Sequence, residues 1–225
     1  STVAVTKPSS RATRDSSALD PRLARNYGEK NSDEVRLIYR DWADAYDSEL
    51  LDEFGYQAPN AAVETLHKRL PSLDSVILDM GCGTGLVGEL LHNLGYRHLD
   101  GLDLSPEMLE KATARGVYRT LGEADLTEIL EIERIYDAVI CVGVFSHQRN
   151  QAFDLVKLFA GLKADGVLVA TVNGKGWRDI GWETLLEQSE RKHGFQIEEI
   201  LDIPYLTRQD IPGKLLVIRP KPQSR

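Results

Sequence analysis

The 225-residue sequence is poor in the features that mark several protein classes. It contains two cysteines, Cys82 and Cys141, which are too few for a disulfide framework. Its longest apolar run, from Ala138 to Phe145, is far too short to cross a membrane, and no secretory apolar segment opens the chain. We therefore expect a soluble protein of the cytoplasm that has no membrane partner.

Basic charge is also in short supply. Lys and Arg number 27 against 35 Asp and Glu, so the formal net charge is −8. An acidic surface repels a phosphate backbone, so we do not expect nucleic-acid binding as the main role. Hydrophobic residues make up 42 % of the chain and charged residues 28 %, a balance that suits an ordinary globular core.

Residues 1–30 differ from the rest in composition. They are rich in Ser, Thr, Arg and Ala, and they show no apolar period of a helix or a strand. We interpret them as a disordered tail outside the fold, with a targeting peptide as the alternative. Three acidic residues weaken that alternative, and residues 31–225 are predicted to form a single domain.

From residue 31 onward the hydrophobic pattern alternates between helices and strands. Helices are predicted at 35–50, 59–70, 86–94, 105–115, 150–162 and 180–193, and strands at 75–79, 98–102, 117–121, 137–142, 166–172, 196–202 and 214–218. This order predicts an α/β fold, a Rossmann-like, doubly wound and mostly parallel seven-stranded sheet with extra N-terminal helices. Between the last two strands there is no helical pattern, so we expect the last strand to be antiparallel.

A glycine-rich turn follows the first predicted strand. The segment Asp79–Gly85 reads D-x-G-x-G-x-G and leads directly into a helix. Glycines let the backbone turn sharply and approach a ligand closely, although a plain strand-to-helix turn is the alternative. A dinucleotide fingerprint requires G-x-G-x-x-G, and its third glycine would fall on Leu86.

With this turn and the landmarks that follow it, the chain resembles the class I S-adenosylmethionine-dependent methyltransferases. The landmarks are Asp103 after the second strand, the segment 122–127 after the third, the fourth strand 136–143, and the segment 158–169. Ala164 and Asp165 replace the Pro and Gly that the family has in this last segment. The segments 39–47, 55–59 and 141–147 look most like the Williams–Beuren-region methyltransferase-like branch.

The resemblance implies a site for S-adenosylmethionine, with S-adenosylhomocysteine as the product. It implies that Asp103 accepts the ribose hydroxyls, with a helix N-terminal acid as the alternative, and that Asp125 accepts the adenine amino group, with Glu123 as competitor. Tyr46 is a candidate donor to the methionine carboxylate. The implied cofactor residues are Tyr46, Asp79, Gly81, Cys82, Gly83, Gly85, Asp103, Leu104, Met108, Ala124, Asp125, Leu126, Cys141 and Val142.

Candidates for the acceptor side follow the fourth strand. His147 is a candidate base, and its alternative is a loop histidine that caps a helix. Tyr56, Phe145 and Trp177 are candidates for an apolar acceptor pocket, and packing explains each of them equally well. No metal site is expected, because two thiols without clustered histidines make a poor one.

Three function classes compete on this pattern. The first is methyl transfer to a small-molecule acceptor by in-line displacement. The second is a non-catalytic or protein-directed S-adenosylmethionine-binding protein, and the third is an NAD(P)-dependent oxidoreductase, which Leu86 disfavours. The acceptor, the use of a general base and the oligomeric state are left open by the sequence.

Overall fold

The computed structural model describes residues 55–145, 155–207 and 210–221. The predicted tail at 1–30, the predicted helix at 35–50, and the site candidates Tyr46 and His147 lie outside these ranges. Within them, no helix is both long and apolar enough to cross a membrane.

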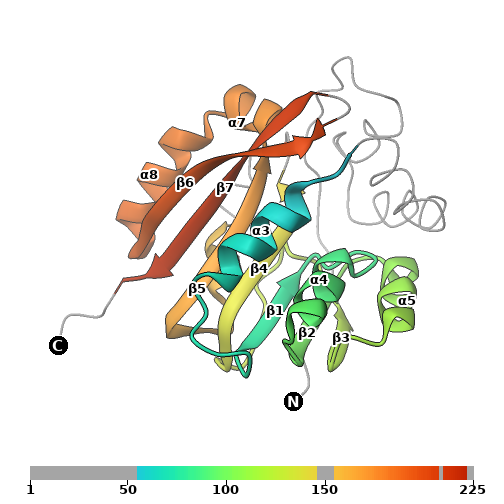
Figure 1. Ribbon diagram of the computed structural model, residues 1–225. Coiled ribbons are helices and arrows are strands. Elements are labelled where there is room, and N and C mark those ends of the chain that lie inside the picture. Colours follow the sequence, from blue (N-terminus) through green and yellow to red (C-terminus); the bar gives the residue numbers. More distant parts are fainter. Residues whose placement is uncertain (1–54, 146–154, 208–209, 222–225) are drawn as a thin grey trace.

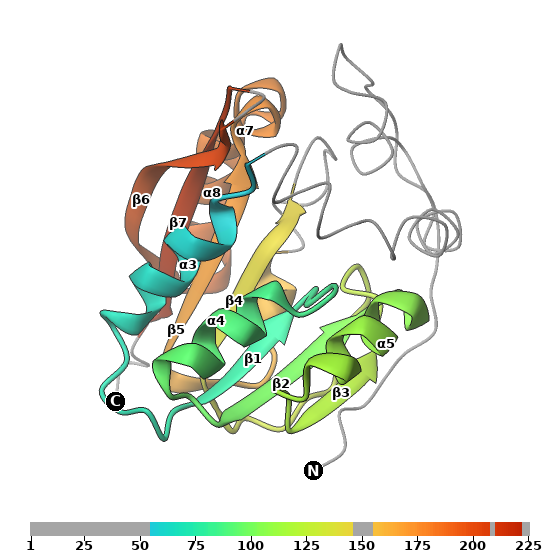
Figure 2. The same cartoon turned by 45° about the vertical axis from the view of Figure 1, so that its right-hand side comes forward.

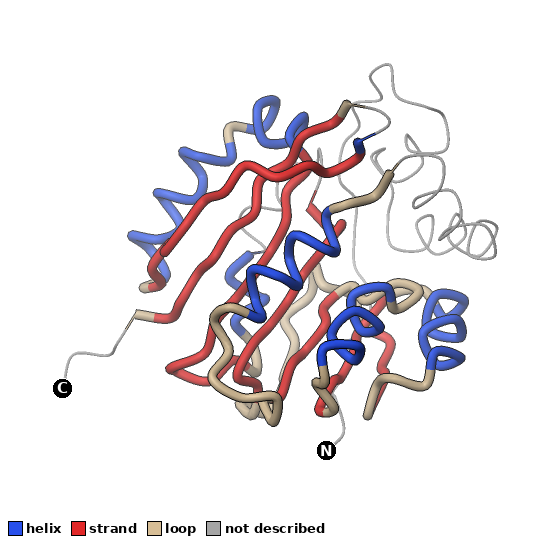
Figure 3. The backbone as a smooth tube through the Cα atoms, in the orientation of Figure 1, coloured by secondary structure: helices blue, strands red, loops and turns tan. Residues whose placement is uncertain are grey.

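A seven-stranded sheet forms the centre of the molecule, in the spatial order β3-β2-β1-β4-β5-β7-β6 (Figures 1 and 3). Strands β1 to β5 are mutually parallel, whereas β7 pairs antiparallel with both β5 and β6. This confirms the predicted fold class, including the reversed last strand. The strands are β1 (Val76–Met80), β2 (His98–Asp103), β3 (Thr120–Glu123), β4 (Tyr136–Phe145), β5 (Leu162–Asn173), β6 (Phe195–Leu206) and β7 (Ile211–Pro220).

Helices cover both faces of the sheet. Figure 2 shows α3 (Ala58–His67), α4 (Leu86–Leu94) and α5 (Pro106–Arg115) in front of the strands. The 3-10 helix η2 (Leu155–Phe159) and the helices α7 (Gly174–Ile180) and α8 (Trp182–His193) lie on the other side. The layers explain why the strands are apolar on both faces.

Alternate residues of β1 enter two separate cores. Ile77 packs with α3 and α4 on one face, together with Val87 and Leu91. Leu78, the next residue, packs on the other face with Trp182 of α8. Because successive side chains of a strand point to opposite faces, Asp79 lies on the α3/α4 face of the sheet.

Several predicted boundaries were wrong. The third strand begins at Thr120, later than the predicted 117, and the helix predicted at 59–70 ends at His67. The helix predicted at 180–193 is α8, which begins at Trp182. The helix before it, α7, was not predicted, and Gly181, with a left-handed φ of +74°, separates the two. In the helix predicted at 150–162, the described residues form only the 3-10 turn η2.

Candidate functional site

The chain reverses its direction of strand addition between β1 and β4. Strands β2 and β3 follow on one side of β1, and β4 and β5 lie on the other. In open α/β sheets, ligands bind at the carboxyl ends of the strands beside such a switch point. A hollow of about 40 Å³ lies there, and it is lined by Tyr56, Pro59, Asp79, Gly81, Cys82, Gly83, Thr84, Leu86, Val87 and Val142.

The three glycines of the turn after β1 all have positive φ, but their surroundings differ. A Cβ on Gly81 would lie 2.4 Å from Cγ2 of Val144, so protein already fills that space. A Cβ on Gly83 would meet no atom of the described residues within 4 Å, and the φ of Gly83 is +54°. The loop therefore presents bare backbone to open space at Gly83, as a binding loop does.

Asp103, at the end of β2, is hydrogen-bonded to this loop. Its Oδ2 accepts a hydrogen bond from the Gly83 N–H at 2.9 Å, and its Oδ1 accepts one from the Ser105 N–H at 2.9 Å. Burial raises the pKa of the carboxyl, while its backbone hydrogen bonds act in the opposite direction. Since a carboxylate has about four acceptor positions, it retains acceptor capacity for a ligand.

Asp79, at the end of β1, is the second buried carboxylate. Its Oδ2 accepts a hydrogen bond from the Tyr118 hydroxyl at 2.6 Å, and its residue is 2 % exposed. Burial, and secondarily the charge of Asp103, raises the pKa of Asp79 to about 7, although the Tyr118 hydrogen bond opposes this shift. The hollow thus has a carboxyl group at its base that changes charge near neutral pH.

Tyr118 was missed by the sequence reasoning. Its ring lies against the middle of α4, where a Cβ on Gly88 would come within 2.3 Å of the Tyr118 Cζ. Glycine in a helix interior lowers helix stability, so its presence needs a reason. Gly88 was the available signal that another side chain packs closely against this helix.

The turn after β3 lies next to the glycine loop. The Ala124 N–H donates to the Asp103 carbonyl at 2.9 Å, and Leu126 Cδ1 would lie 3.5 Å from a Cβ on Gly81. Asp125 Oδ1 accepts from both the N–H and the hydroxyl of Thr127, which fixes the turn. The structure therefore brings the segment 124–126 beside the glycine loop.

The remaining cofactor candidates divide by burial. Gly85 is the N-cap of α4, and Leu104 is half-buried after β2. Met108 is buried in α5, and its N–H donates to the Ser105 hydroxyl at 3.2 Å. Cys141 is fully buried in the core on the α8 face, whereas Cys82 lines the hollow, and both thiols are free. The side chain of Cys141 therefore acts as packing.

The acceptor candidates separate in the same way. Tyr56 lines the hollow, and its ring centroid lies 5.8 Å from that of Tyr205, which the sequence reasoning also missed. Phe145 is 2 % exposed and packs edge-on against Trp182. Trp177 is half-buried, stacked on Trp182, with the Lys214 Nζ 5.7 Å from its ring centroid. Only Tyr56 of the three directly borders the described hollow.

The segment before α3 places Tyr56 at the site. Tyr56 forms an isolated antiparallel bridge with Leu206 at the end of β6, and the Gln57 N–H donates to the Tyr205 carbonyl at 3.0 Å. A Cβ on Gly143 would lie 2.3 Å from the Tyr56 hydroxyl oxygen. The glycine at the end of β4 thus allows Tyr56 to reach across the carboxyl end of that strand.

No group of His, Cys, Asp and Glu in the described ranges has the geometry to hold a metal ion. The described residues at the hollow supply buried carboxylates, backbone N–H groups, a tyrosine hydroxyl and apolar side chains.

Comparison with known proteins shows that the chain is similar to methyltransferases. Residues 77–166 match a family described as a methyltransferase domain. Over 113 residues the chain is 40 % identical to human Methyltransferase-like protein 27, covering 48 % of this chain and 46 % of that protein. Over 171 residues it is 30 % identical to a Ubiquinone biosynthesis O-methyltransferase of Xylella fastidiosa (strain 9a5c), covering 70 % and 65 %. The chain thus spans about half to two thirds of the length of these relatives.

The fold also matches a solved structure that holds the expected product. This is magnesium protoporphyrin IX methyltransferase from Synechocystis PCC 6803 with bound S-adenosylhomocysteine, with a TM-score of 0.62 and 17 % identity over 84 % of this chain and 99 % of that one. Methyltransferase-like protein 27 is the Williams–Beuren-region protein, so this relative confirms the branch that the sequence predicts. The chain therefore belongs to the class I S-adenosylmethionine-dependent methyltransferases.

Proposed function

We propose that this chain transfers a methyl group from S-adenosylmethionine to a small-molecule acceptor by in-line displacement. The observation that carries the proposal is the open space over Gly83, which lies between two buried carboxylates, Asp79 and Asp103, at the switch point of the sheet. A ligand that brings positive charge and a sugar diol suits this arrangement.

Asp103 is assigned to the ribose. Its two oxygens are already oriented by backbone N–H groups of Gly83 and Ser105, so its free acceptor positions are fixed before the ligand arrives. Pre-oriented acceptors lose little conformational entropy on binding. Ala124, Asp125 and Leu126 then border the adenine, because they follow the strand adjacent to Asp103.

Asp79 is assigned to the cationic methionine end of the cofactor. It lies at the base of the hollow, and an ionised carboxylate there attracts positive charge strongly because it is screened from water. Tyr118 holds the carboxylate through its hydroxyl. The two tyrosines Tyr56 and Tyr205 border the same end, on the side from which an acceptor would approach.

Methyl transfer from a sulfonium asks little of acid–base groups, because the leaving thioether is neutral. Holding the acceptor atom in line with the methyl group, about 3 Å away, supplies much of the rate. A base is needed only for an acceptor that is protonated at the working pH. His147, which lies outside the described residues, stays a candidate for that role.

Two observations favour a small, partly aromatic acceptor. The Xylella fastidiosa relative is named for O-methylation in ubiquinone biosynthesis. In this chain, the ring of Tyr56 lines the hollow, and the ring of Tyr205 lies beside it with a centroid distance of 5.8 Å. We also propose a cytoplasmic location, since both described cysteines are free.

Isothermal titration calorimetry with S-adenosylmethionine, S-adenosylhomocysteine and NAD tests the cofactor assignment. We expect micromolar binding of the first two and far weaker binding of NAD. Comparable or tighter binding of NAD would reject the proposal. If the cofactor binds, a screen of phenol and carboxylate acceptors with methyl-labelled cofactor tests transfer, and binding without transfer to any acceptor would favour the non-catalytic alternative.

A further inference from the structure

A second and larger cavity lies at the opposite edge of the sheet. Its volume is about 600 Å³, within the range typical of small-molecule sites. It is bordered by the start of β5 and β6, the end of β7, and the loop before β4, all of which are at the amino edge of the parallel strands. The sheet therefore separates it from the glycine loop.

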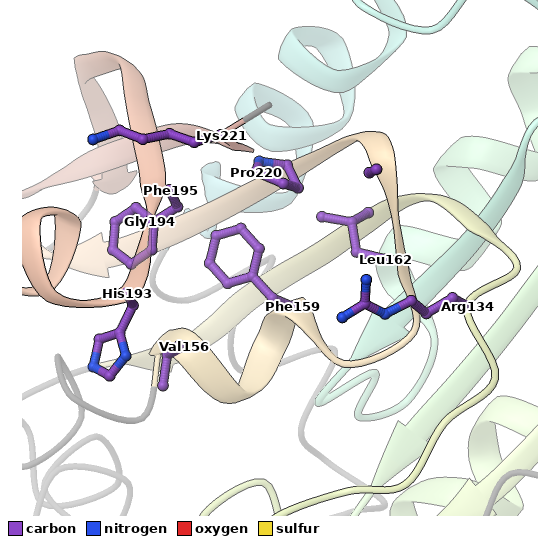
Figure 4. A pocket seen from close by; sticks show the side chains of 10 residues that line it. Arg134, Val156, Phe159, Leu162, His193, Gly194, Phe195, Pro220 and Lys221 are labelled. Atoms are coloured by element: carbon purple, nitrogen blue, oxygen red, sulfur yellow. The ribbon is translucent and has the colours of Figure 1, made fainter. Parts of the chain in front are cut away.

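The floor of this cavity is aromatic. The rings of Phe159 and Phe195 are stacked, with centroids 5.1 Å apart and planes 15° from parallel. Phe195 is 2 % exposed, whereas Phe159 is half-buried and contributes open ring surface. Figure 4 shows the two rings side by side, with Leu162 and Pro220 nearby. Such a floor accepts a flat aromatic ring by stacking or edge contact.

The rim of the cavity is cationic. Arg134, His193 and Lys221 line it, and none of the described lining residues is acidic, although the chain as a whole is acidic. Figure 4 shows Arg134 and His193 on opposite sides of the phenylalanine pair.

Arg134 and Lys221 differ from other cations nearby in having no acidic partner among the described residues. Lys163 and Arg219, each one residue from a lining residue, form ion pairs with Asp137 and Glu198. In the described part of the chain, Arg134 and Lys221 have no carboxylate within 4.0 Å. Within the described residues, the positive charge of Arg134 and Lys221 is therefore not offset by an ion pair.

We propose that this cavity binds a small aromatic anion, with the ring on Phe159 and the acidic group at Arg134. Guanidinium pairs with a carboxylate, sulfonate or phosphate through two parallel hydrogen bonds, which gives it an advantage over lysine. The cavity has the volume, the floor and the charge for such a ligand. This site is independent of the proposed methyl transfer, because it lies at the other edge of the sheet.

The experiment uses two fluorescent probes that share an aromatic body and differ in charge. The anion 8-anilinonaphthalene-1-sulfonate and the neutral N-phenyl-1-naphthylamine are titrated into the full chain with excess S-adenosylhomocysteine present. We expect the anion to bind at one site and more tightly than the neutral probe. The absence of saturable binding of the anion, or its displacement by S-adenosylhomocysteine, would overturn the proposal.

Three variants locate the bound anion. Arg134→Glu is expected to weaken binding of the anion by about tenfold or more and to leave the affinity for the neutral probe unchanged. Arg178→Glu is the matched control, since Arg178 is exposed on α7 at the carboxyl edge of the sheet and its reversal changes the net charge equally. Ala164→Trp, at an exposed position of the lining, should fill the cavity and abolish binding of both probes.

Two results would refute this assignment. One is an unchanged affinity for the anion in Arg134→Glu, or an equal loss in Arg178→Glu. The other is a dimer of the wild-type chain that Ala164→Trp dissociates in sedimentation velocity, because a second copy of the chain would then be the occupant.

Discussion

The Tyr118 hydroxyl donates a 2.6 Å hydrogen bond to the buried carboxyl group of Asp79. Tyr118 precedes β3 and Asp79 ends β1, so this bond joins two strands that are not neighbours in the sheet. The tyrosine ring lies against Gly85 of the glycine loop and Gly88 of α4, where added Cβ atoms would come within 3.1 and 2.3 Å of the ring. The protonation state of Asp79 and the support of the loop are therefore linked through one contact.

Asp79→Asn is expected to change the pH dependence of stability. Burial raises the pKa of Asp79 to about 7 in the folded chain, well above the ordinary value of about 4 for an aspartate, so the folded state holds an extra proton between these values. The contribution of Asp79 to the free energy of unfolding is fully present below about pH 4. It is lost as the pH rises through 7, and the loss is at most about 4 kcal/mol.

Urea unfolding of the ligand-free protein at several values between pH 5 and 8 measures this effect. The wild type should lose stability with rising pH more steeply than Asp79→Asn, in which the side chain stays neutral. Asp103, whose pKa is also raised by burial, leaves a residual slope of the same sign in the variant. Parallel curves for the two proteins would show that Asp79 is not the titrating group.

Tyr118→Phe should lower stability by about 1–3 kcal/mol at neutral pH, because it leaves a buried carboxyl oxygen without its donor. The hydrogen bond lowers the pKa of Asp79, so its loss should move the titration to higher pH. In the background of Asp79→Asn the same change should cost less, and a double-mutant cycle measures the difference. Equal costs in both backgrounds would deny the coupling.

Gly83→Ala should weaken the binding of S-adenosylmethionine by about tenfold or more while the protein remains folded. The added methyl group meets no atom of the described part of the chain within 4 Å, so it projects into the space assigned to the ligand. Gly116→Ala is the matched control, since Gly116 also has positive φ and open surroundings but ends α5. Both variants should lose roughly 1–2 kcal/mol of stability from the left-handed backbone, and only Gly83→Ala should lose affinity in calorimetry.

Asp103→Ala should raise the dissociation constant of S-adenosylmethionine about 10- to 100-fold, since charge-assisted hydrogen bonds to the ribose are each worth roughly 1.5–3 kcal/mol. It also removes the acceptor of two backbone N–H groups, so a loss of stability accompanies it. Ser105→Ala separates these effects, because it removes the N-cap of α5 at a cost of about 1 kcal/mol. Ser105→Ala should keep its affinity for S-adenosylmethionine within about twofold of the wild type. If Asp103→Ala also kept that affinity, the ribose assignment would be wrong, and only the role of Asp103 at the helix terminus would remain.

The order of strands and helices follows from local pattern, and so does the glycine turn. Buried strands such as Val76–Met80 are apolar runs bounded by turns, and Ser105-Pro106 marks a helix start by its own chemistry. These features depend on residues a few positions apart, which is why the sequence predicts them. The exact ends of some helices, such as the break at Gly181, could be located only in the structure.

What the sequence alone determined is the fold class, the switch-point edge and the D-x-G-x-G-x-G loop with Asp103 beyond it. What only the tertiary structure decided is which side chains meet there: Tyr118 on Asp79, Tyr205 beside Tyr56, and Cys141 inside the core. These contacts join residues far apart in the chain, so no local period encodes them. They depend on how strand order and helix packing bring distant segments together, and that is settled only when the whole sheet forms.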